Sequence, residues 1–217
     1  MSTLAIVGAG PNLGLAAASR FGADGFDIGL VARNAQRLEE LRGTLGQRSI
    51  RAAAAAADIR RPQAVGPALE DLIERLGPVD VLLCGPSVVV EWIKPVAEST
   101  VADVRPHLEL SVLGAIDAVQ TVLPGMRRRG GGTLLFTTGG AAVAPSADRA
   151  STVISYAVEV AYARMLHEAL ASEGIHVAHT AIVGPLGSGL QHEPAHVAEL
   201  LWRQHAERGD FQTVLGR

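Results

Sequence analysis

The sequence predicts an α/β fold: a single-domain, Rossmann-like, doubly wound parallel sheet of about seven strands with helices on both faces. Short apolar runs alternate along the chain with longer segments in which apolar residues recur at helical spacing. Strands that alternate with helices pair in parallel through right-handed crossovers, and these put helices on both faces of the sheet. The predicted strands are Leu4–Val7, Asp27–Val31, Ile50–Ala56, Val79–Leu83, Gly132–Phe136, His176–Ile182 and Thr213–Leu215. The predicted helices lie near residues 12–23, 34–46, 62–76, 100–129, 151–173 and 194–208.

Local signals support individual elements in chain order. In the second predicted helix, Leu38 and Leu41 alternate with charged residues at helical spacing. The fourth predicted strand, Val79–Leu83, is apolar apart from Asp80, as expected of a strand that is buried on both faces. Pro194 suits the first turn of the last helix, where its missing N–H has no intrahelical partner to lose.

Composition and charge limit the classes of function. The chain has 217 residues, of which 48% are hydrophobic and 19% are charged, so we expect one large core and one domain over residues 1–217. The net charge is −3 and the sequence pI is about 6.2, so we expect no nucleic acid partner and no membrane-surface partner. Three consecutive arginines, residues 127–129, are more simply the cationic end of a helix than a phosphate-binding patch.

The single cysteine and the histidines predict neither a disulfide nor a metal site. Cys84 has no partner for an internal disulfide, and the N-terminus lacks the features of a signal peptide, so we expect a cytoplasmic protein. We expect Cys84 to be buried and inert. His192 and His196 have the spacing of a metal pair, but Pro194 lies between them and no third ligand is evident.

A glycine-rich loop between the first strand and the first helix predicts a dinucleotide site. Gly8, Gly10 and Gly14 miss the G-x-G-x-x-G spacing by one residue, and Asn12 stands where a related spacing needs glycine. Small residues let the backbone approach a pyrophosphate, and Asn tolerates positive φ better than other non-glycine residues. The helix that starts near Leu13 would point its N–H groups at the phosphates. The alternative is a strand-to-helix turn whose glycines serve packing alone.

The end of the second strand predicts a preference for NADP(H) over NAD(H). An NAD site usually places a carboxylate here for the ribose hydroxyls, whereas this chain has Ala32 followed by Arg33. A guanidinium matches the extra phosphate of NADP with a planar fork of donors. A solvated arginine at a helix start is the alternative, and it is disfavoured because the helix dipole is positive there.

Further segments follow in a set order along the chain. They are Asp58–Ile59, VDVLLCGPS (79–87), LELSVLGAIDAVQTVLPGMRRRGGGTLLFTT (108–138), HEALASEGIHVAHTAIVGP (167–185) and EPAHVAELLWRQH (193–205). Together with the glycine loop and Val31–Arg33, they resemble the short-chain dehydrogenase/reductase family over nearly the whole chain. The resemblance implies that Asp58 and Ile59 lie near the adenine ring. The family's Asn-Asn-Ala-Gly signature is replaced by Cys84–Ser87, in which Gly85 is a candidate cofactor contact.

The resemblance also shows that the usual catalytic residues are missing. Family members usually carry Asn, Ser, Tyr and Lys: the Tyr exchanges a proton with the substrate, the Lys lowers the pKa of the Tyr, the Ser positions the carbonyl and the Asn supports a water chain. By this resemblance the Asn falls at Ser111, the Ser at Thr138, the Tyr at Thr152 and the Lys at Tyr156. Thr152 and Tyr156 are four residues apart on one helix and therefore share a face.

A second register makes Tyr156 the family Tyr and puts Val160 at the Lys position. It needs four extra residues before the helix, so we favour the ungapped register, because insertions change which side chains face the cleft. Neither register supplies the Lys. Thr138 would still hydrogen-bond a carbonyl and Tyr156 would be a displaced proton donor, or these hydroxyls satisfy only local hydrogen bonds. His176 and His179 lie in the sixth strand, but the sequence gives neither a role.

Three functions follow from these observations. The first is an NADP(H)-dependent oxidoreductase acting on a carbonyl or hydroxyl substrate with an atypical active site. The second is a non-redox enzyme on the same fold, such as an isomerase or dehydratase, and the third is a catalytically inactive NADP-binding or interaction protein. The family's lid is cut to Leu186–Glu193, which favours an open cleft for a small-molecule or carrier-bound substrate. The resemblance implies a homodimer or homotetramer that pairs through the helices at 100–129 and 151–173.

Overall fold

The structure is a computed structural model that describes residues 1–61 and 63–216. Within these residues, seven strands pair in parallel in one sheet, with the order β3-β2-β1-β4-β5-β6-β7. This confirms the predicted single-domain, doubly wound fold. The strands are β1 (Thr3–Val7), β2 (Asp27–Ala32), β3 (Ala52–Ala56), β4 (Val81–Cys84), β5 (Gly132–Gly139), β6 (Ile175–Ile182) and β7 (Gln212–Leu215).

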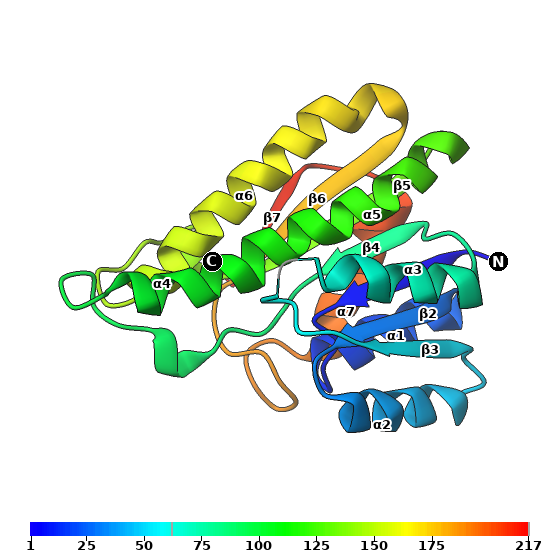
Figure 1. Ribbon diagram of the computed structural model, residues 1–217, viewed down its shortest axis with the longest axis horizontal. Helices are drawn as coiled ribbons and strands as arrows, with labels where there is room; N and C mark the ends of the chain where they lie inside the picture. Colours follow the sequence, from blue (N-terminus) through cyan, green and yellow to red (C-terminus); the bar gives the residue numbers. More distant parts are fainter. Residues whose placement is uncertain (62, 217) are drawn as a thin grey trace.

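Helices cover both faces of the sheet (Figure 1). One face buries the apolar sides of α3, α5 and α6, and the other face buries those of α1, α2 and α7. The α-helices of the described residues are α1 (Leu13–Ala23), α2 (Ala35–Gly46), α3 (Val65–Leu76), α4 (Val101–Leu108), α5 (Gly114–Arg129), α6 (Ala150–Leu170) and α7 (Pro194–Glu207). Short 3₁₀ turns occur at Val90–Trp92, Gly140–Ala142 and Ala171–Glu173.

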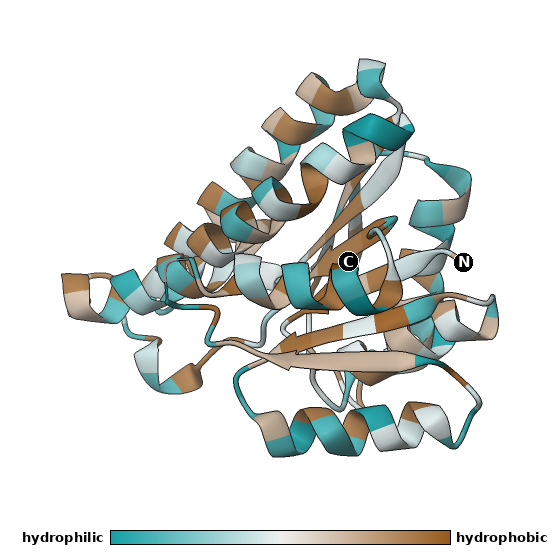
Figure 2. Ribbon diagram, turned by 45° about the vertical axis from the view of Figure 1, so that its right-hand side comes forward, coloured by the Kyte–Doolittle hydropathy of each residue, from teal (hydrophilic) through white to brown (hydrophobic). Residues whose placement is uncertain are grey.

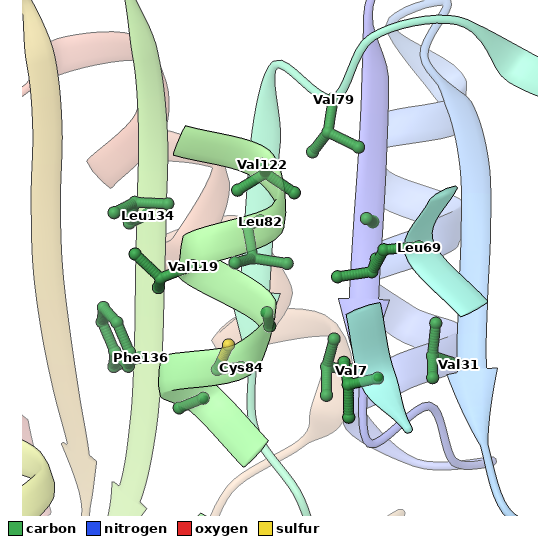
Figure 3. Close-up of a cluster of buried hydrophobic side chains, with 14 of the residues drawn as sticks. Val7, Val31, Leu69, Val79, Leu82, Cys84, Val119, Val122, Leu134 and Phe136 are labelled. Carbon is green, nitrogen blue, oxygen red and sulfur yellow. The ribbon is translucent and has the colours of Figure 1, made fainter. Parts of the chain in front are cut away.

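The two cores lie between the sheet and these helix layers. Figure 2 shows strands drawn largely in brown between helices banded in brown and teal, as expected when each helix buries one apolar side. In the core beneath α3 and α5, Val7 and Leu82 from the central strands pack with Leu69, Val119 and Phe136 (Figure 3). Burial on both faces explains why the central strands read as continuous apolar runs rather than as alternating patterns.

The boundaries of some predicted elements were wrong by a few residues. The third strand begins at Ala52 rather than Ile50, and the fourth runs over Val81–Cys84. Residue 62, where the third predicted helix would begin, lies outside the described residues, and so does residue 217 of the predicted domain; α3 itself begins at Val65.

The predicted helix at 100–129 is a succession of three segments. A π-helical turn at Glu109–Leu113 separates α4 from α5. Such turns recur at functional sites and are not visible to a pattern that counts apolar residues every three or four positions. The arginines at 127–129 do end a helix, because Gly130 follows α5 in a left-handed conformation.

One carboxyl group lies inside the core beneath α6. Glu159 is 1% exposed, and its Oε1 atom has no hydrogen-bond partner among the described residues. Burial raises the pKa of Glu159 well above its usual range, because a charged carboxylate loses its hydration there. The sequence analysis did not single out Glu159, although apolar residues flank it on both sides.

We expect the stability of the protein to depend on pH through Glu159. The folded protein holds a proton that the unfolded chain releases above about pH 4.3, so the free energy of unfolding falls as pH rises from there through the raised folded pKa. Glu159→Gln removes this slope. Thermal melts from pH 5 to pH 9 should therefore show the variant gaining several degrees in Tm over the wild type at the alkaline end, at about 2–4 °C per kcal/mol.

Glu168→Gln serves as the control for that experiment, because Glu168 is exposed on the same helix. Its melting curve should follow the wild type at every pH. A constant difference between Glu159→Gln and the wild type across the pH range would contradict the protonated, buried state.

Candidate active site

The glycine loop after β1 lies at the carboxyl edge of the sheet, and its three glycines have different reasons to be glycine. Gly8 has φ +94°, and a Cβ there would lie 2.6 Å from the Cα of Pro86 in the loop after β4. A Cβ on Gly14 would lie 3.1 Å from the Cα of Ala9, so this glycine lets α1 pack close to the loop. A Cβ on Gly10 would meet no atom within 4 Å, because Gly10 faces an open cleft.

Asn12 does not adopt the positive φ that the sequence interpretation allowed for it. Its φ is −88°, and it stands at the N-cap of α1, just before Leu13. The left-handed residue of this turn is Gly8, which lies where the chain leaves β1. The positive φ of this loop therefore falls at Gly8, earlier in the chain than Asn12, where the glycine spacing suggested it. Asn12 and Leu13 still line the same cleft as Gly10.

A second cleft continues from the glycine loop toward the ends of β2 and β3. Gly8, Gly10, Pro11, Pro86 and Ser87 line both clefts, so the two form one continuous groove at the carboxyl edge of the sheet. Ligands bind at this edge in open α/β sheets, where the strand order reverses. The predicted cofactor residues that line the second cleft but not the first are Arg33, Asp58 and Ile59.

The second cleft is rich in guanidinium groups. Arg33 and Arg37 are exposed, and both line it beside the small residue Ala32. Asn34 accepts a 3.0 Å hydrogen bond from the backbone N–H of Arg37 and so caps α2. The sequence identified Arg33 by its place after the strand, but it missed Arg37 because a helical arginine is usually only solvated.

Asp58 is already engaged by an arginine. Arg60 donates through Nε to Oδ1 at 3.1 Å and through Nη2 to Oδ2 at 2.8 Å, a bidentate pair. The Arg60 hydrogen bonds, together with the charge of Arg33, hold the pKa of Asp58 below its usual value. The guanidinium of Arg60 also lies 5.6 Å from the centre of the Trp92 ring. Trp92 comes from a 3₁₀ turn that the sequence analysis did not identify.

The first cleft contains the hydroxyl groups of Thr138 and Tyr156. Both are mostly buried, at 4% and 7% exposed, yet both line the cleft together with Gly10 and Gly85. Thr138 lies near the end of β5, and Tyr156 lies in the second turn of α6. A Cβ on Gly85 would collide with Oγ1 of Thr137, so a side chain at this position would force the Thr137 hydroxyl to move.

The surroundings of Tyr156 raise its pKa. Burial and the nearby Glu159 raise the pKa well above its usual value, and the backbone of Gly139 and the charge of Arg149 offset only part of that rise. Tyr156 is therefore a neutral phenol at physiological pH. The sequence analysis noted the missing cation, but it did not foresee a buried carboxyl group one turn away.

Thr152 and Ser111 are buried, and neither belongs to the residues that line the two clefts. The hydroxyl of Thr152 donates to the carbonyl of Arg149 at 3.0 Å, one turn before Tyr156. Ser111 lies in the π-helical turn between α4 and α5. Their assignment to catalysis stays a prediction.

Two further results concern the groups considered from sequence. Cys84 is 1% exposed, and burial raises the pKa of its thiol, so it is the inert cysteine that the sequence predicted. His179 is fully buried, and its Nε2 lies 2.8 Å from Oγ1 of Thr138, a contact that the sequence analysis missed. Among residues 1–61 and 63–216 there is no group of three or more potential metal ligands, and no helix there is long and apolar enough to cross a bilayer.

Comparison with known proteins places this groove in a family. The model of the family described as short chain dehydrogenase matches residues 2–193. A sulfoacetaldehyde reductase 2 of Chromohalobacter salexigens is 29% identical over 137 residues, which are 63% of this chain and 54% of the relative. A 3-dehydrosphinganine reductase of Arabidopsis thaliana is 27% identical over 125 residues, 57% of this chain and 36% of the relative. The aligned parts thus span about a third to a half of these curated relatives.

Solved structures share the whole fold. The L-sorbose reductase of Gluconobacter frateurii, described as a complex with NADPH and L-sorbose, has a TM-score of 0.89 at 20% identity, over 99% of this chain and 95% of that chain. A 7α-hydroxysteroid dehydrogenase, described as a complex with NADH, has a TM-score of 0.89 at 24% identity, over 99% and 91%. At these identities the likeness concerns the fold. With the family model covering most of the sequence, the chain belongs to the short chain dehydrogenase family.

Proposed function

We propose that the protein is an NADP(H)-dependent oxidoreductase that acts on a carbonyl or hydroxyl substrate with an atypical active site. One observation carries this proposal: the glycine loop, the arginine-lined cleft and the hydroxyls of Thr138 and Tyr156 share one continuous groove. The family and its reductase relatives support the oxidoreductase class. The fold by itself would not, because one fold supports many reactions.

The groove fits a dinucleotide. Gly10 offers backbone without a side chain to the open cleft, and α1 begins beside it at Leu13 with no side-chain cap on its first turn. Asp58, Ile59 and Gly85 line the same groove. NADP(H) bound there would supply or accept a hydride.

The charges of the second cleft favour NADP(H) over NAD(H). Arg33, Arg37 and Arg60 line this cleft, against one carboxylate, Asp58, whose two oxygens accept from Arg60. A site for an unphosphorylated ribose would gain from a free carboxylate, whereas a phosphate gains from guanidinium donors. Arg33 and Arg37 are the residues that we expect to contact the extra phosphate.

Thr138 and Tyr156 would act on the substrate oxygen. In carbonyl reduction, each neutral hydroxyl would donate a hydrogen bond to the carbonyl, and Tyr156 would give its proton to the oxygen as negative charge develops there. A phenol with a raised pKa is a weak acid, so orientation rather than acidity would supply most of the rate. We expect slower turnover than an enzyme with the family's Tyr–Lys pair.

The loop between β6 and α7 supports an open cleft for a bulky or carrier-bound substrate. Gly187 donates to the carbonyl of His192, His192 donates to that of Pro185, and Leu190 donates to that of Gly187, so the loop is closed on itself. Leu186 lines the cleft beside Gly184.

The single, buried Cys84 suits a reducing cytoplasm, which we propose as the location.

We further propose that the protein forms a homodimer or homotetramer through α4, α5 and α6. Exposed apolar side chains gather there: Leu113 is 49%, Ile154 is 40% and Val158 is 44% exposed. With Val101 and Val104 they line an apolar groove between α4 and α6. A two-fold axis would set the same stripe of a second copy against this groove, which satisfies both apolar surfaces at once.

Arg33→Ala is expected to weaken NADPH binding by about 10- to 100-fold, the loss of one charge-assisted contact or two, while NADH binding changes little. Titration calorimetry with both nucleotides measures this. Arg42→Ala is the control, because Arg42 is an exposed arginine of α2 that pairs with Glu39 outside the cleft. Equal losses for NADPH and NADH would contradict the phosphate assignment. Failure of the wild type to bind either nucleotide would overturn the proposed function.

Thr138→Val and Tyr156→Phe each remove one hydroxyl from the cleft without much change in volume. We expect each to lower kcat by about 10-fold or more toward carbonyl substrates while the Kd for NADPH stays within about twofold. A panel of ketones, aldehydes and quinones, followed by the loss of NADPH absorbance, provides the assay. Turnover unaffected by either change would remove both residues from the mechanism. Binding of NADPH without any turnover would favour a binding protein.

Ile154→Glu combined with Val158→Glu should convert the assembly into monomers, because two charges would be buried in the apolar contact. Light scattering on the intact chain gives the mass. Leu190→Glu is the matched control, since Leu190 is 51% exposed in the loop before α7. A wild type of monomer mass would refute the assembly proposal.

A further inference from the structure

Behind the cleft, Thr138 is the first member of a short chain of hydrogen-bonding groups. Its Oγ1 lies 2.8 Å from Nε2 of His179, and Nδ1 of His179 lies 3.4 Å from Nε2 of Gln212. The sheet register explains the contact: Thr138 pairs with Ala181, and His179 lies two residues earlier on the same face of β6. Gln212 is the strand partner of His179 on β7.

The ring of His179 has little freedom in this position. The residue is fully buried, its ring stacks on Phe211, and its backbone N–H donates to the carbonyl of Phe211 at 2.7 Å. Burial, with the charge of Arg164, lowers the pKa of His179 to about 4, so the ring is neutral at physiological pH. A neutral imidazole has one donor nitrogen and one acceptor nitrogen, so what binds one of them decides the role of the other.

The side-chain amide of Gln212 decides which ring nitrogen of His179 carries the proton. Its NH₂ group lies against Nδ1 and can only donate, which makes Nδ1 the acceptor and leaves the proton on Nε2. The Nε2–H then donates to Oγ1 of Thr138. Because that oxygen already accepts from His179, the hydroxyl proton of Thr138 is free to point into the cleft that Thr138 lines.

We propose that His179, with its tautomer set by Gln212, is a positioning residue that turns the hydroxyl proton of Thr138 toward the substrate oxygen. No proton leaves His179 in this scheme; the ring orients a donor, and a substrate carbonyl receives its hydrogen bond. The catalytic part of the inference rests on the proposed function, because it assumes a carbonyl in the cleft. The tautomer is a property of the protein alone.

The first experiment reads the tautomer without turnover. The ¹⁵N chemical shifts of the imidazole of His179, assigned with a His179→Gln variant, should show the proton on Nε2 in the wild type at pH 7.5. In Thr138→Val the Nε2 proton loses its acceptor, so its ¹H shift should move upfield. A wild type with the proton on Nδ1 would overturn the proposal whatever the activity.

The second experiment uses the reach of amide side chains. A Gln at position 179 places an amide nitrogen near the former Nε2, whereas an Asn reaches only the former Nδ1. We expect His179→Gln to keep kcat within about threefold of the wild type and His179→Asn to lose about 10-fold or more, with the KM for NADPH unchanged in both. Equal losses in both variants would mean that His179 only packs the core.

Gln212→Met tests the end of the chain and keeps its length. It should lower kcat severalfold with unchanged Tm and NADPH affinity. Gln204→Met is the matched control, because Gln204 is buried nearby but bonds to Thr180 and Thr213 instead. Equal kcat in the two glutamine variants would refute the role of Gln212. If no carbonyl substrate is turned over by the wild type, the proposed function fails, while the ¹⁵N measurement still decides the tautomer.

Discussion

The close approach of two loops at the carboxyl edge of the sheet is the constraint on which the groove depends. β1 and β4 are neighbours, and the chain leaves them toward opposite faces, into α1 after β1 and toward α4 and α5 after β4. The loops meet where the backbone of Gly8 packs against Pro86, too closely for any Cβ. This contact forms the floor shared by both clefts. A side chain at residue 8 would push the loops apart and disturb both ends of the groove together.

From that floor the groove changes character in two directions. Toward β2 and β3 it is charged, with exposed guanidinium groups and one paired carboxylate. Toward β5 and β6 it holds neutral hydroxyls, backed by a neutral imidazole and a protonated carboxyl. At the first end, the exposed guanidinium groups would attract a negatively charged ligand that stays partly hydrated when it binds. At the second end the burial that excludes water also keeps each group uncharged, and for Tyr156 the charge of Arg149 offsets only part of that effect.

The sequence predicted the fold well because its signals are local and repeated. Apolar runs identified all seven strands, and helical spacing identified six helical segments, of which the one at 100–129 is divided into α4, a π-helical turn and α5. The glycine loop and Arg33 were singled out from their places after two strands. What it missed depends on contacts between distant segments. The ring over the guanidinium of Arg60, for example, comes from Trp92 in a separate 3₁₀ turn. The bond between Thr138 and His179 joins residues that are 41 apart, and only the register of β5 with β6 reveals it.

The surroundings of Tyr156 decide which physical quantity this end of the groove can adjust. A lysine beside a tyrosine adjusts acidity, because its charge stabilises the phenolate. Here burial acts in the opposite direction and raises the pKa of Tyr156, so its acidity falls and a charged phenolate at that position would be costly. What can still be adjusted is the orientation of the hydroxyl protons: some face the cleft, and others donate to neighbouring protein groups. The hydroxyl of Thr152 donates its hydrogen bond to the carbonyl of Arg149. In the proposed arrangement the hydroxyl of Thr138 accepts from His179, so its own proton can point into the cleft. Such a site depends on hydrogen-bond donors that are already oriented before a ligand binds. The parallel strands β5, β6 and β7 are well suited to hold these donors, because strands fix side chains more precisely than loops do.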